Sequence, residues 1–232
     1  MNIEEYAKKA PQYYDVKIPK LLRKYLCSNS FNTILDCGCG DGALLYALYN
    51  EGFLKNKVVY AIDMSKRRIS LVKKIDKNLR AFVDNAESLR TIQSNSIDFF
   101  ISTQVIEHVN DKKMVASIDK VTRKNSVIYI STVFKKKWGW YFYRNKGKWV
   151  LDPTHIKEYK RDSDLLDLFK ERSFRLLENK KSQLFFSLGG FVLPRIGIKS
   201  RNIKKNKFFV ILRKIKAPIL GYYNWEIVLR KE

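Results

Sequence analysis

The stretch Thr33–Leu48, TILDCGCGDGALLYAL, places three glycines and two carboxylates between two apolar runs. The first run predicts a short buried strand over residues 33–37, and the second predicts a helix over residues 43–50. In a β-α-β unit, the turn between them lies at the carboxyl edge of the sheet, where such folds bind their ligands. Because glycine tolerates tight backbone geometry, this turn would let a ligand approach the main chain closely.

The charge of the turn separates two classes of ligand. Gly38, Gly40 and Ala43 formally satisfy the dinucleotide pattern G-x-G-x-x-G/A, which alone is weak evidence. A dinucleotide would place a pyrophosphate at this turn. Asp36 closes the strand and Asp41 lies within the turn, so two carboxylates would repel that group. They suit a ligand that carries an ammonium and a sulfonium beside a nucleoside, such as S-adenosyl-L-methionine (SAM).

A further acid stands where such a nucleoside would need it. The segment VVYAIDMS, residues 58–65, ends a second predicted strand with Asp63, 23 positions after Gly40. An acid there can bind two ribose hydroxyls, although it could also cap the helix that begins near Ser65. NAD-binding folds use the same ribose contact, so only the acids of the first turn discriminate between the two ligands.

Apolar periodicity predicts alternating strands and helices over most of the chain. Strands are expected over residues 33–37, 57–62, 79–83, 96–103 and 125–134, with a closing strand over 224–232. Helices are expected over residues 43–50, 66–74, 112–121 and from about 162 onward, with two short helices within 3–26. This order indicates β-α-β units and a parallel sheet covered on both faces.

Four segments in order resemble the successive motifs of the class I SAM-dependent methyltransferases. They are ILDCGCGDG, VVYAIDMS, AFVDNAESL and IDFFISTQVIEHVND. The match is strong over residues 31–134. It is weaker over DPTHIKEYKRDSDLLDLFKERSF, which resembles the family's H-x-x-E-[FY]…LL…GF stretch. The chain is most similar to the small-molecule, type 11-like branch that includes ubiquinone- and menaquinone-pathway enzymes.

The resemblance implies a single domain with a Rossmann-like, doubly wound, mostly parallel seven-stranded sheet and helices on both faces. Residues 1–30 would form an N-terminal helical cap, and residues 31–134 the SAM-binding core. Residues 135–161 would form a lid-like insertion, and the basic residues 162–232 would complete the sheet. The implied activity is methyl transfer from SAM to a small-molecule, lipid-linked or glycan acceptor, with S-adenosyl-L-homocysteine as the product.

The resemblance also assigns cofactor contacts. Asp36 and the glycines would line the methionine end, Asp63 would bind the ribose, Met64 would pack on the adenine and Gln104 would flank the sulfonium. The family's third motif, D-A-E-x-L, reads N-A-E-S-L here, so either Asn85 or its neighbour would take the adenine amino group. The implied cofactor residues are Asp36, Gly38, Cys39, Gly40, Gly42, Asp63, Met64, Asp84, Asn85, Ala86 and Gln104.

Both histidines are candidate catalytic residues. His108 lies in QVIEHVND, where some relatives carry E-x-x-E-H and are thought to hold a divalent metal. Gln104 replaces the first of those acids and removes one oxygen anion, so no metal is expected. The alternative for Glu107 and His108 is a structural role at a helix start. His155 lies in a polar turn, and O-methyl transfer gains from a base that titrates near pH 7.

The charge is strongly positive and unevenly distributed. The 232 residues carry a formal net charge of +23, and residues 133–232 hold 25 basic and 9 acidic side chains. Residues 179–225 contain 11 basic residues and no acid, with Phe, Leu and Ile between them. This composition fits an anionic membrane surface better than nucleic acid, although both remain open.

Three functions follow as alternatives: a methyltransferase for a small or lipid-linked acceptor, an RNA or tRNA methyltransferase, and a non-catalytic SAM-binding protein. The chain lacks the N-P-P-[YF] run that base-amine methyltransferases often show after the fourth strand, which favours the first. Three cysteines are a poor disulfide framework, and the N-terminus has no signal-peptide core. We therefore expect a cytoplasmic protein that could lie peripherally at a membrane.

Overall fold

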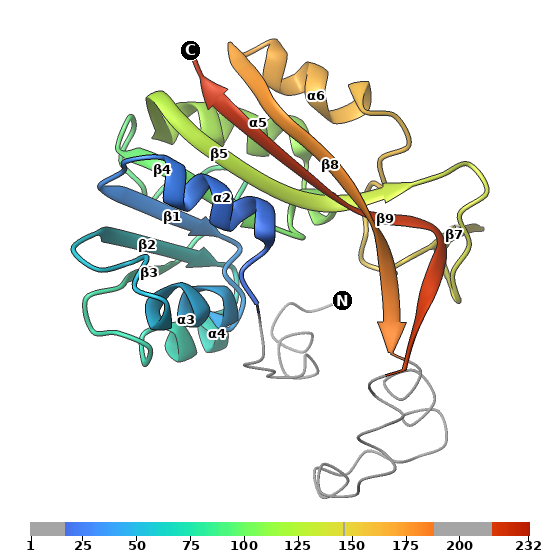
Figure 1. The fold of residues 1–232 in the computed structure, drawn as a ribbon, viewed down its shortest axis with the longest axis horizontal. Coiled ribbons are helices and arrows are strands. Elements are labelled where there is room, and N and C mark those ends of the chain that lie inside the picture. The colour runs from blue at the N-terminus through green and yellow to red at the C-terminus, as the bar shows by residue number, and fades with distance from the viewer. Residues whose placement is uncertain (1–16, 146, 188–214) are drawn as a thin grey trace, which may run out of the picture.

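A seven-stranded sheet in the order β3-β2-β1-β4-β5-β9-β8 forms the centre of the molecule (Figure 1). The computed structural model describes residues 17–145, 147–187 and 215–232. The strands of the sheet are β1 (Thr33–Cys37), β2 (Val58–Asp63), β3 (Arg80–Val83), β4 (Ile97–Thr103), β5 (Thr122–Lys135), β8 (Phe174–Ser187) and β9 (Lys216–Lys231). The first five pair in parallel, and β9 is antiparallel to both of its neighbours. The predicted α/β fold with a mostly parallel seven-stranded sheet is confirmed.

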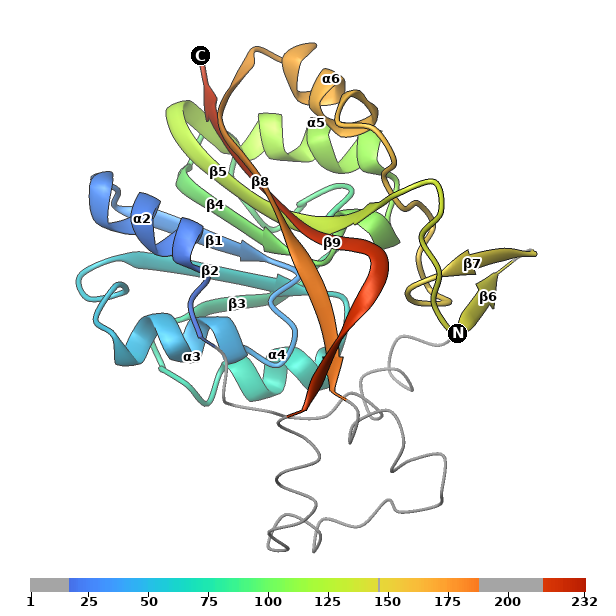
Figure 2. The same cartoon turned by 45° about the vertical axis from the view of Figure 1, so that its right-hand side comes forward.

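Helices cover both faces of this sheet (Figure 2). They are α2 (Lys20–Ser28), α3 (Ala43–Asn50), α4 (Lys66–Val72), α5 (Asp111–Val121) and α6 (Ser163–Lys170), with a short 3₁₀ helix η1 (Ile106–His108). The first three pack on one face, and α5 and α6 pack on the other. Of the two helices expected within residues 3–26, the part before residue 17 lies outside the described residues.

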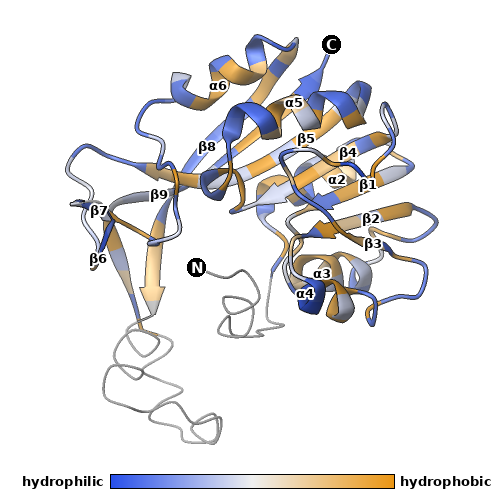
Figure 3. Ribbon diagram, turned by 180° about the vertical axis from the view of Figure 1, so that it is seen from behind, coloured by the Kyte–Doolittle hydropathy of each residue, from blue (hydrophilic) through white to orange (hydrophobic). Residues whose placement is uncertain are grey.

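Alternating side chains on the strands build these two cores. Ile34 and Phe99 point toward α2–α4, whereas Leu35 and Phe100, one position later on the same strands, point toward α5 and α6. All four are fully buried. This follows from the two-residue period of a strand, which makes a strand covered on both faces apolar at every position. Figure 3 shows the central strands largely in the hydrophobic colour.

The closing strand is longer than predicted. The alternating pattern indicates residues 224–232, but β9 begins at Lys216 and pairs with β8 along its whole length. The sequence does not predict this extension because it contains Pro218. Proline cannot donate a hydrogen bond to a neighbouring strand, so its presence argues against a central strand. The pairing with β5 reaches only Tyr222, so Pro218 lies where β9 has a single partner strand.

The segment between β5 and α6, expected to be irregular, contains a small hairpin. It consists of β6 (Tyr143–Asn145) and β7 (Lys148–Val150), with Gly147 in the left-handed region at φ +78°. None of the helices in the described part of the chain combines the length and the apolar character that crossing a bilayer requires. The division of the chain into cap, core, insertion and C-terminal part stays a prediction.

Candidate active site

The glycine turn between β1 and α3 is shaped by contacts to two other elements. The backbone N–H groups of Gly38 and Cys39 both donate to the carbonyl of Ile62 at the end of β2, at 2.8 and 2.9 Å. A Cβ on Gly38 would lie 2.3 Å from Val105 Cγ2, so the loop after β4 packs directly on the turn. A Cβ on Gly40 would meet nothing within 4 Å. Open space for a ligand therefore lies over Gly40.

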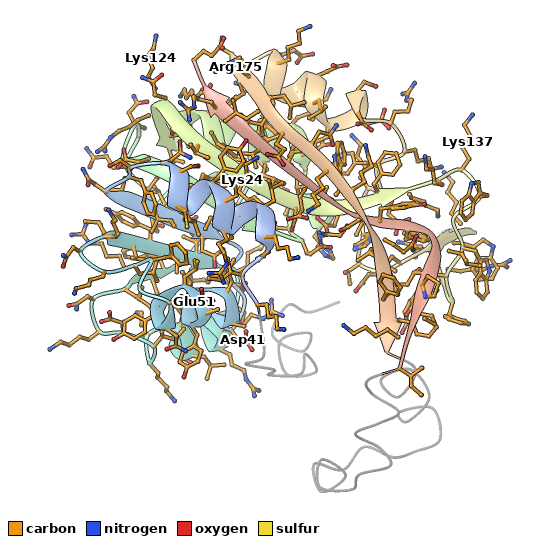
Figure 4. The ribbon with its side chains drawn as sticks, in the orientation of Figure 1. Lys24, Asp41, Glu51, Lys124, Lys137 and Arg175 are labelled. Carbon is orange, nitrogen blue, oxygen red and sulfur yellow. The ribbon has the colours of Figure 1, made fainter. Side chains whose placement is uncertain are left out.

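Asp36 is the most informative residue of this turn. Its side chain is 1% exposed, and neither carboxylate oxygen has a hydrogen-bond partner among the residues that the structure describes. Burial, reinforced by the nearby Asp63, raises the pKa of Asp36 to about 7. An unpaired buried carboxylate costs free energy unless a cation or donor meets it. Asp41, the other acid of the turn, is partly exposed (Figure 4).

Asp63 holds the second half of the turn. Its Oδ2 accepts from the Gly40 N–H at 3.1 Å, and its Oδ1 accepts from the Ser65 N–H at 2.9 Å. Arg68 Nη1 lies 3.5 Å from the same carboxylate. Asp63 thus anchors both the glycine turn and the start of α4, and its ribose role stays a prediction. Met64 beside it is 44% exposed, which leaves an apolar surface for the predicted adenine contact.

Polar side chains in the loop after β3 form hydrogen bonds with other groups of the same loop. Asp84 accepts hydrogen bonds from the N–H groups of Asn85 and Thr91 and from the Thr91 hydroxyl. Burial would raise the pKa of Asp84, but these bonds outweigh it and hold the pKa below its usual value. Asn85 Oδ1 accepts from the Glu87 N–H at 2.9 Å. Ala86 is buried. The choice between Asp84 and Asn85 for the adenine stays a prediction.

Gln104 follows β4 in a backbone conformation that side chains rarely adopt, with φ +55°. Its N–H donates to the Ser131 carbonyl at 2.8 Å, and its Nε2 donates to Asn224 Oδ1 at 3.1 Å. The residue therefore ties the end of β4 to β5 and β9. Its predicted contact with the sulfonium is not tested by this geometry.

Cys37 and Cys39 are buried on either side of the first glycine, with Cys39 7% exposed. Burial raises the pKa of both thiols well above the usual value, and the neighbouring Asp36 raises it further. Both thiols therefore stay protonated near neutral pH. Protonated, buried thiols are poor nucleophiles, so a role in filling space within the turn suits both side chains.

His108 and His155, 47 positions apart, meet at the same edge of the sheet. Their ring centroids are 4.7 Å apart with the rings edge to face. The carbonyl of Glu107 accepts from the N–H groups of Ile156 and Lys157, at 2.8 and 3.2 Å, and so fixes the His155 turn against η1. Since Val105 of the same loop packs on Gly38, this pair lies next to the glycine turn.

Hydrogen bonds fix the protons on both rings. His155 Nδ1 lies 2.9 Å from Glu158 Oε1, and a carboxylate only accepts, so Nδ1 carries the proton. His108 Nδ1 lies 3.0 Å from Thr154 Oγ1, whose own proton goes to Asp152. His108 Nδ1 is therefore also the donor. When either ring is uncharged, its lone pair is therefore on Nε2.

The charges around these rings are also set by burial. Burial, with a contribution from His155, lowers the pKa of His108 and favours its neutral form. Burial alone would raise the pKa of Glu158, but the hydrogen bonds from His155 and the Leu151 N–H lower it overall. The Glu158 carboxylate is therefore charged near neutral pH, and Lys135 Nζ at 3.3 Å balances it.

Glu107 completes the cluster. Its Oε2 accepts from the Thr132 hydroxyl at 2.9 Å, whereas its Oε1 is buried and has no hydrogen-bond partner in the described part of the chain. Burial raises the pKa of Glu107 to about 7. One possible ligand atom from each of Glu107, His108 and His155 lies within 4.8 Å of the others. This arrangement can receive a divalent cation or a protic group. The expectation of no metal stays a prediction.

Sequence reasoning missed several members of this site. Glu158, which orients His155, and Asn224, which holds Gln104, were not singled out, nor were Thr132 and Thr154. The H-x-x-E pattern in the segment HIKEY carried a signal for Glu158, because a three-residue spacing in a turn can bring the two side chains together. No local pattern marks Asn224, whose partner is 120 positions away.

A family model described as "Methyltransferase domain" matches residues 28–168, more than half of the chain. The chain belongs to the class I SAM-dependent methyltransferases. The methyltransferase thus takes SAM as its cofactor, and the buried, unpartnered carboxylate of Asp36 and the open space over Gly40 fit that ligand. No curated protein matches the sequence.

Solved structures share the fold at low sequence identity. A SAM-dependent methyltransferase from Methanosarcina mazei is 16% identical with a TM-score of 0.62, over 93% of this chain and 99% of that one. The [4+2]-cyclase SpnF is 14% identical with a TM-score of 0.65, over 91% and 79%. Geranyl diphosphate C-methyltransferase from Streptomyces coelicolor A3(2) is 12% identical with a TM-score of 0.56, over 87% and 74%.

The first prediction concerns Asp36. Because its carboxyl has a pKa of about 7 and the charged form attracts the ammonium of SAM, SAM affinity should rise from pH 6 to pH 8, by up to about tenfold per pH unit below the pKa. Calorimetry should show weaker binding by Asp36→Asn and no such rise. Titration of SAM itself is common to both proteins, so equal pH profiles would contradict the assignment.

The second prediction separates two glycines of the turn. Gly38→Ala should lower the free energy of unfolding in urea by about 1–3 kcal/mol, because the new Cβ would collide with Val105. The double variant with Val105→Ala should recover part of that loss. Gly40→Ala should lower the free energy of unfolding less, because its Cβ would meet no described atom within 4 Å. It should nevertheless weaken SAM binding. Equal unfolding losses with no recovery would exclude the Val105 contact as the cause.

Proposed function

We propose that the methyltransferase methylates a hydroxyl group of a small-molecule acceptor with an apolar, lipid-like part. The observation that carries this proposal is the pair of histidines whose Nδ1 atoms face Thr154 and Glu158, which leaves Nε2 to accept a hydrogen bond. Beside them, Oε1 of Glu107 has no hydrogen-bond partner among the described residues. These three groups can accept hydrogen bonds, which is what a protic acceptor offers. They lie next to the glycine turn that fits SAM.

SAM supplies a methyl group already activated on a sulfonium, so the protein has mainly to position the acceptor and remove its proton. We assign proton removal to His155 Nε2. Glu158, hydrogen-bonded to Nδ1, orients the ring and stabilises the imidazolium that forms. His108, neutral and in contact with the same ring, would contact the acceptor as the second catalytic residue.

The apolar part of the acceptor is inferred from the surroundings of Glu158. Tyr222 donates to Glu158 Oε2 at 3.1 Å, and the Leu151 N–H donates to Oε1 at 2.7 Å. Leu151 and Tyr222 belong to an apolar cluster with Val133 and Tyr141. A small acceptor with a hydrocarbon or aromatic portion would suit these surroundings better than a highly polar one.

The substrate class is tested by transfer of a labelled methyl group. The purified protein is incubated with methyl-labelled SAM and a cell extract, which is then separated into lipid, small-molecule, RNA and protein fractions. Label in the lipid or small-molecule fraction is expected. Label in RNA would support the RNA methyltransferase instead. SAM binding without any label would support a non-catalytic or different activity, as the cyclase that shares this fold illustrates.

The third prediction concerns the proposed base. His155→Ala should lower kcat by about 10²–10⁴-fold, because the acceptor would lose the group that takes its proton. Glu158→Gln, which removes the charge behind the ring, should shift the acidic limb of the kcat–pH profile to lower pH. SAM affinity, measured by calorimetry, should remain near wild type in both variants. An unchanged pH profile in Glu158→Gln would assign that residue a merely structural role.

A further inference from the structure

The segment between β5 and β7 exposes an unusual number of large aromatic side chains. We call residues 136–149, apart from residue 146, the aromatic arm. Trp138 is 64% exposed, and Trp140, Phe142 and Tyr143 are 39–40% exposed. Figures 1 and 2 show the β6–β7 hairpin standing beside the sheet, away from the helices that cover its faces. Single exposed aromatics are ordinary, but four within six residues indicate a contact surface.

Ring contacts join five aromatic side chains of the arm into one group: Trp140, Tyr141, Phe142, Tyr143 and Trp149. The ring of Trp140 lies 4.8 Å from that of Phe142 and 5.6 Å from that of Trp149. Tyr141 lies 5.1 Å from Phe142 and 5.7 Å from Tyr143. The rings meet at 62–67°, edge to face. They therefore cover each other, whereas a surface that binds single-stranded RNA needs open ring faces on which bases can stack.

Cations surround the aromatic side chains of the arm. Lys136, Lys137, Arg144 and Lys148 are exposed, and the Arg144 guanidinium lies 4.2 Å from the ring centroid of Trp149. Figure 4 shows Lys137 pointing away from the fold. No Asp or Glu occurs in the sequence between residues 119 and 152. Among the described residues, the ion pairs include none of these four cations. Against the effect of burial, Lys136 nevertheless contributes to lowering the pKa of Asp162, so a nearby acid compensates the positive charge of the arm only in part.

The base of the arm is attached to the proposed catalytic group. Glu158, which orients His155, accepts from the Leu151 N–H immediately after β7. Lys135, which precedes the arm, contacts both Glu158 and the Trp149 carbonyl. The two ends of the arm thus meet at the carboxylate behind the candidate base. Whatever the arm binds is held close to the acceptor site.

We propose that the aromatic arm inserts into an anionic lipid bilayer, so that the acceptor reaches the His155 site from that bilayer. Tryptophan and tyrosine prefer the membrane–water interface, because their rings are apolar and carry a polar edge. Exposed lysines and arginines beside them are attracted by anionic lipid headgroups. The route of the acceptor rests on the proposed function, whereas the docking itself does not.

Sedimentation with vesicles tests the docking with the full-length protein and without SAM or acceptor. Binding is expected to vesicles of phosphatidylcholine with 30% phosphatidylglycerol, and to fall at least tenfold on pure phosphatidylcholine. Trp138→Ala and Lys137→Glu together should lower the partition coefficient at least tenfold. The matched controls are Tyr49→Ala on α3, 46% exposed, and Lys124→Glu at the opposite end of β5. Both controls should bind almost like the wild type.

Brominated lipids give a second measurement that does not depend on charge alone. They should quench the fluorescence of the exposed arm tryptophans Trp138 and Trp140, whereas Trp225 is fully buried. The double variant Trp138→Ala and Trp140→Ala should therefore lose most of the quenching. SAM calorimetry reports that each variant is folded. Absence of binding to anionic vesicles would overturn the proposal, as would equal losses in the controls. Salt-dependent RNA binding that the arm variants abolish, without vesicle binding, would assign the arm to RNA.

The docking and the activity can fail separately. Vesicle binding with no methyl transfer would support the membrane docking and contradict the proposed acceptor chemistry. Methyl transfer to a water-soluble acceptor, unaffected by the arm variants and with no vesicle binding, would contradict the membrane docking. It would still support the methyltransferase activity.

Discussion

The buried carboxylate of Asp36 is the constraint on which the rest of the site depends. A carboxylate removed from water without a partner is costly, and burial accordingly raises its pKa to about 7. A cationic ligand in the open space over Gly40 would offset this cost, and SAM is predicted to be that ligand. The turn can have this shape because Ile62 and Asp63 hold its N–H groups from the neighbouring strand.

The acceptor side of the site depends on the same edge of the sheet. The carboxyl ends of parallel strands meet there, so the loops after β1, β2 and β4 converge. Loss of positive charge during methyl transfer disfavours unpaired cations nearby. Two cations near the described site are paired, Arg68 with Asp63 and Lys135 with Glu158. A protein with a net charge of +23 can thus keep an acidic cofactor turn.

Much of the fold can be predicted from local patterns in the sequence. The apolar strands before the glycine turn and before Asp63 were predicted to within a residue, because a strand buried on both faces is apolar at successive positions. The start of β9 was not predicted, because Pro218 interrupts the apolar pattern at a place where β9 has only one partner strand. The β6–β7 hairpin has too few residues for any periodicity to indicate it.

For the site, the sequence by itself determined the cofactor class. The glycines and acids predicted to bind it lie within a few residues of two strand ends, and their spacing is local. Only the tertiary structure decided that His108 and His155 form a pair, that Glu158 orients one of them and that Asn224 holds Gln104. The histidine pair joins residues 47 positions apart and the Gln104–Asn224 contact residues 120 positions apart, so both depend on how strands and loops pack in space. Periodicity along the chain cannot predict such contacts.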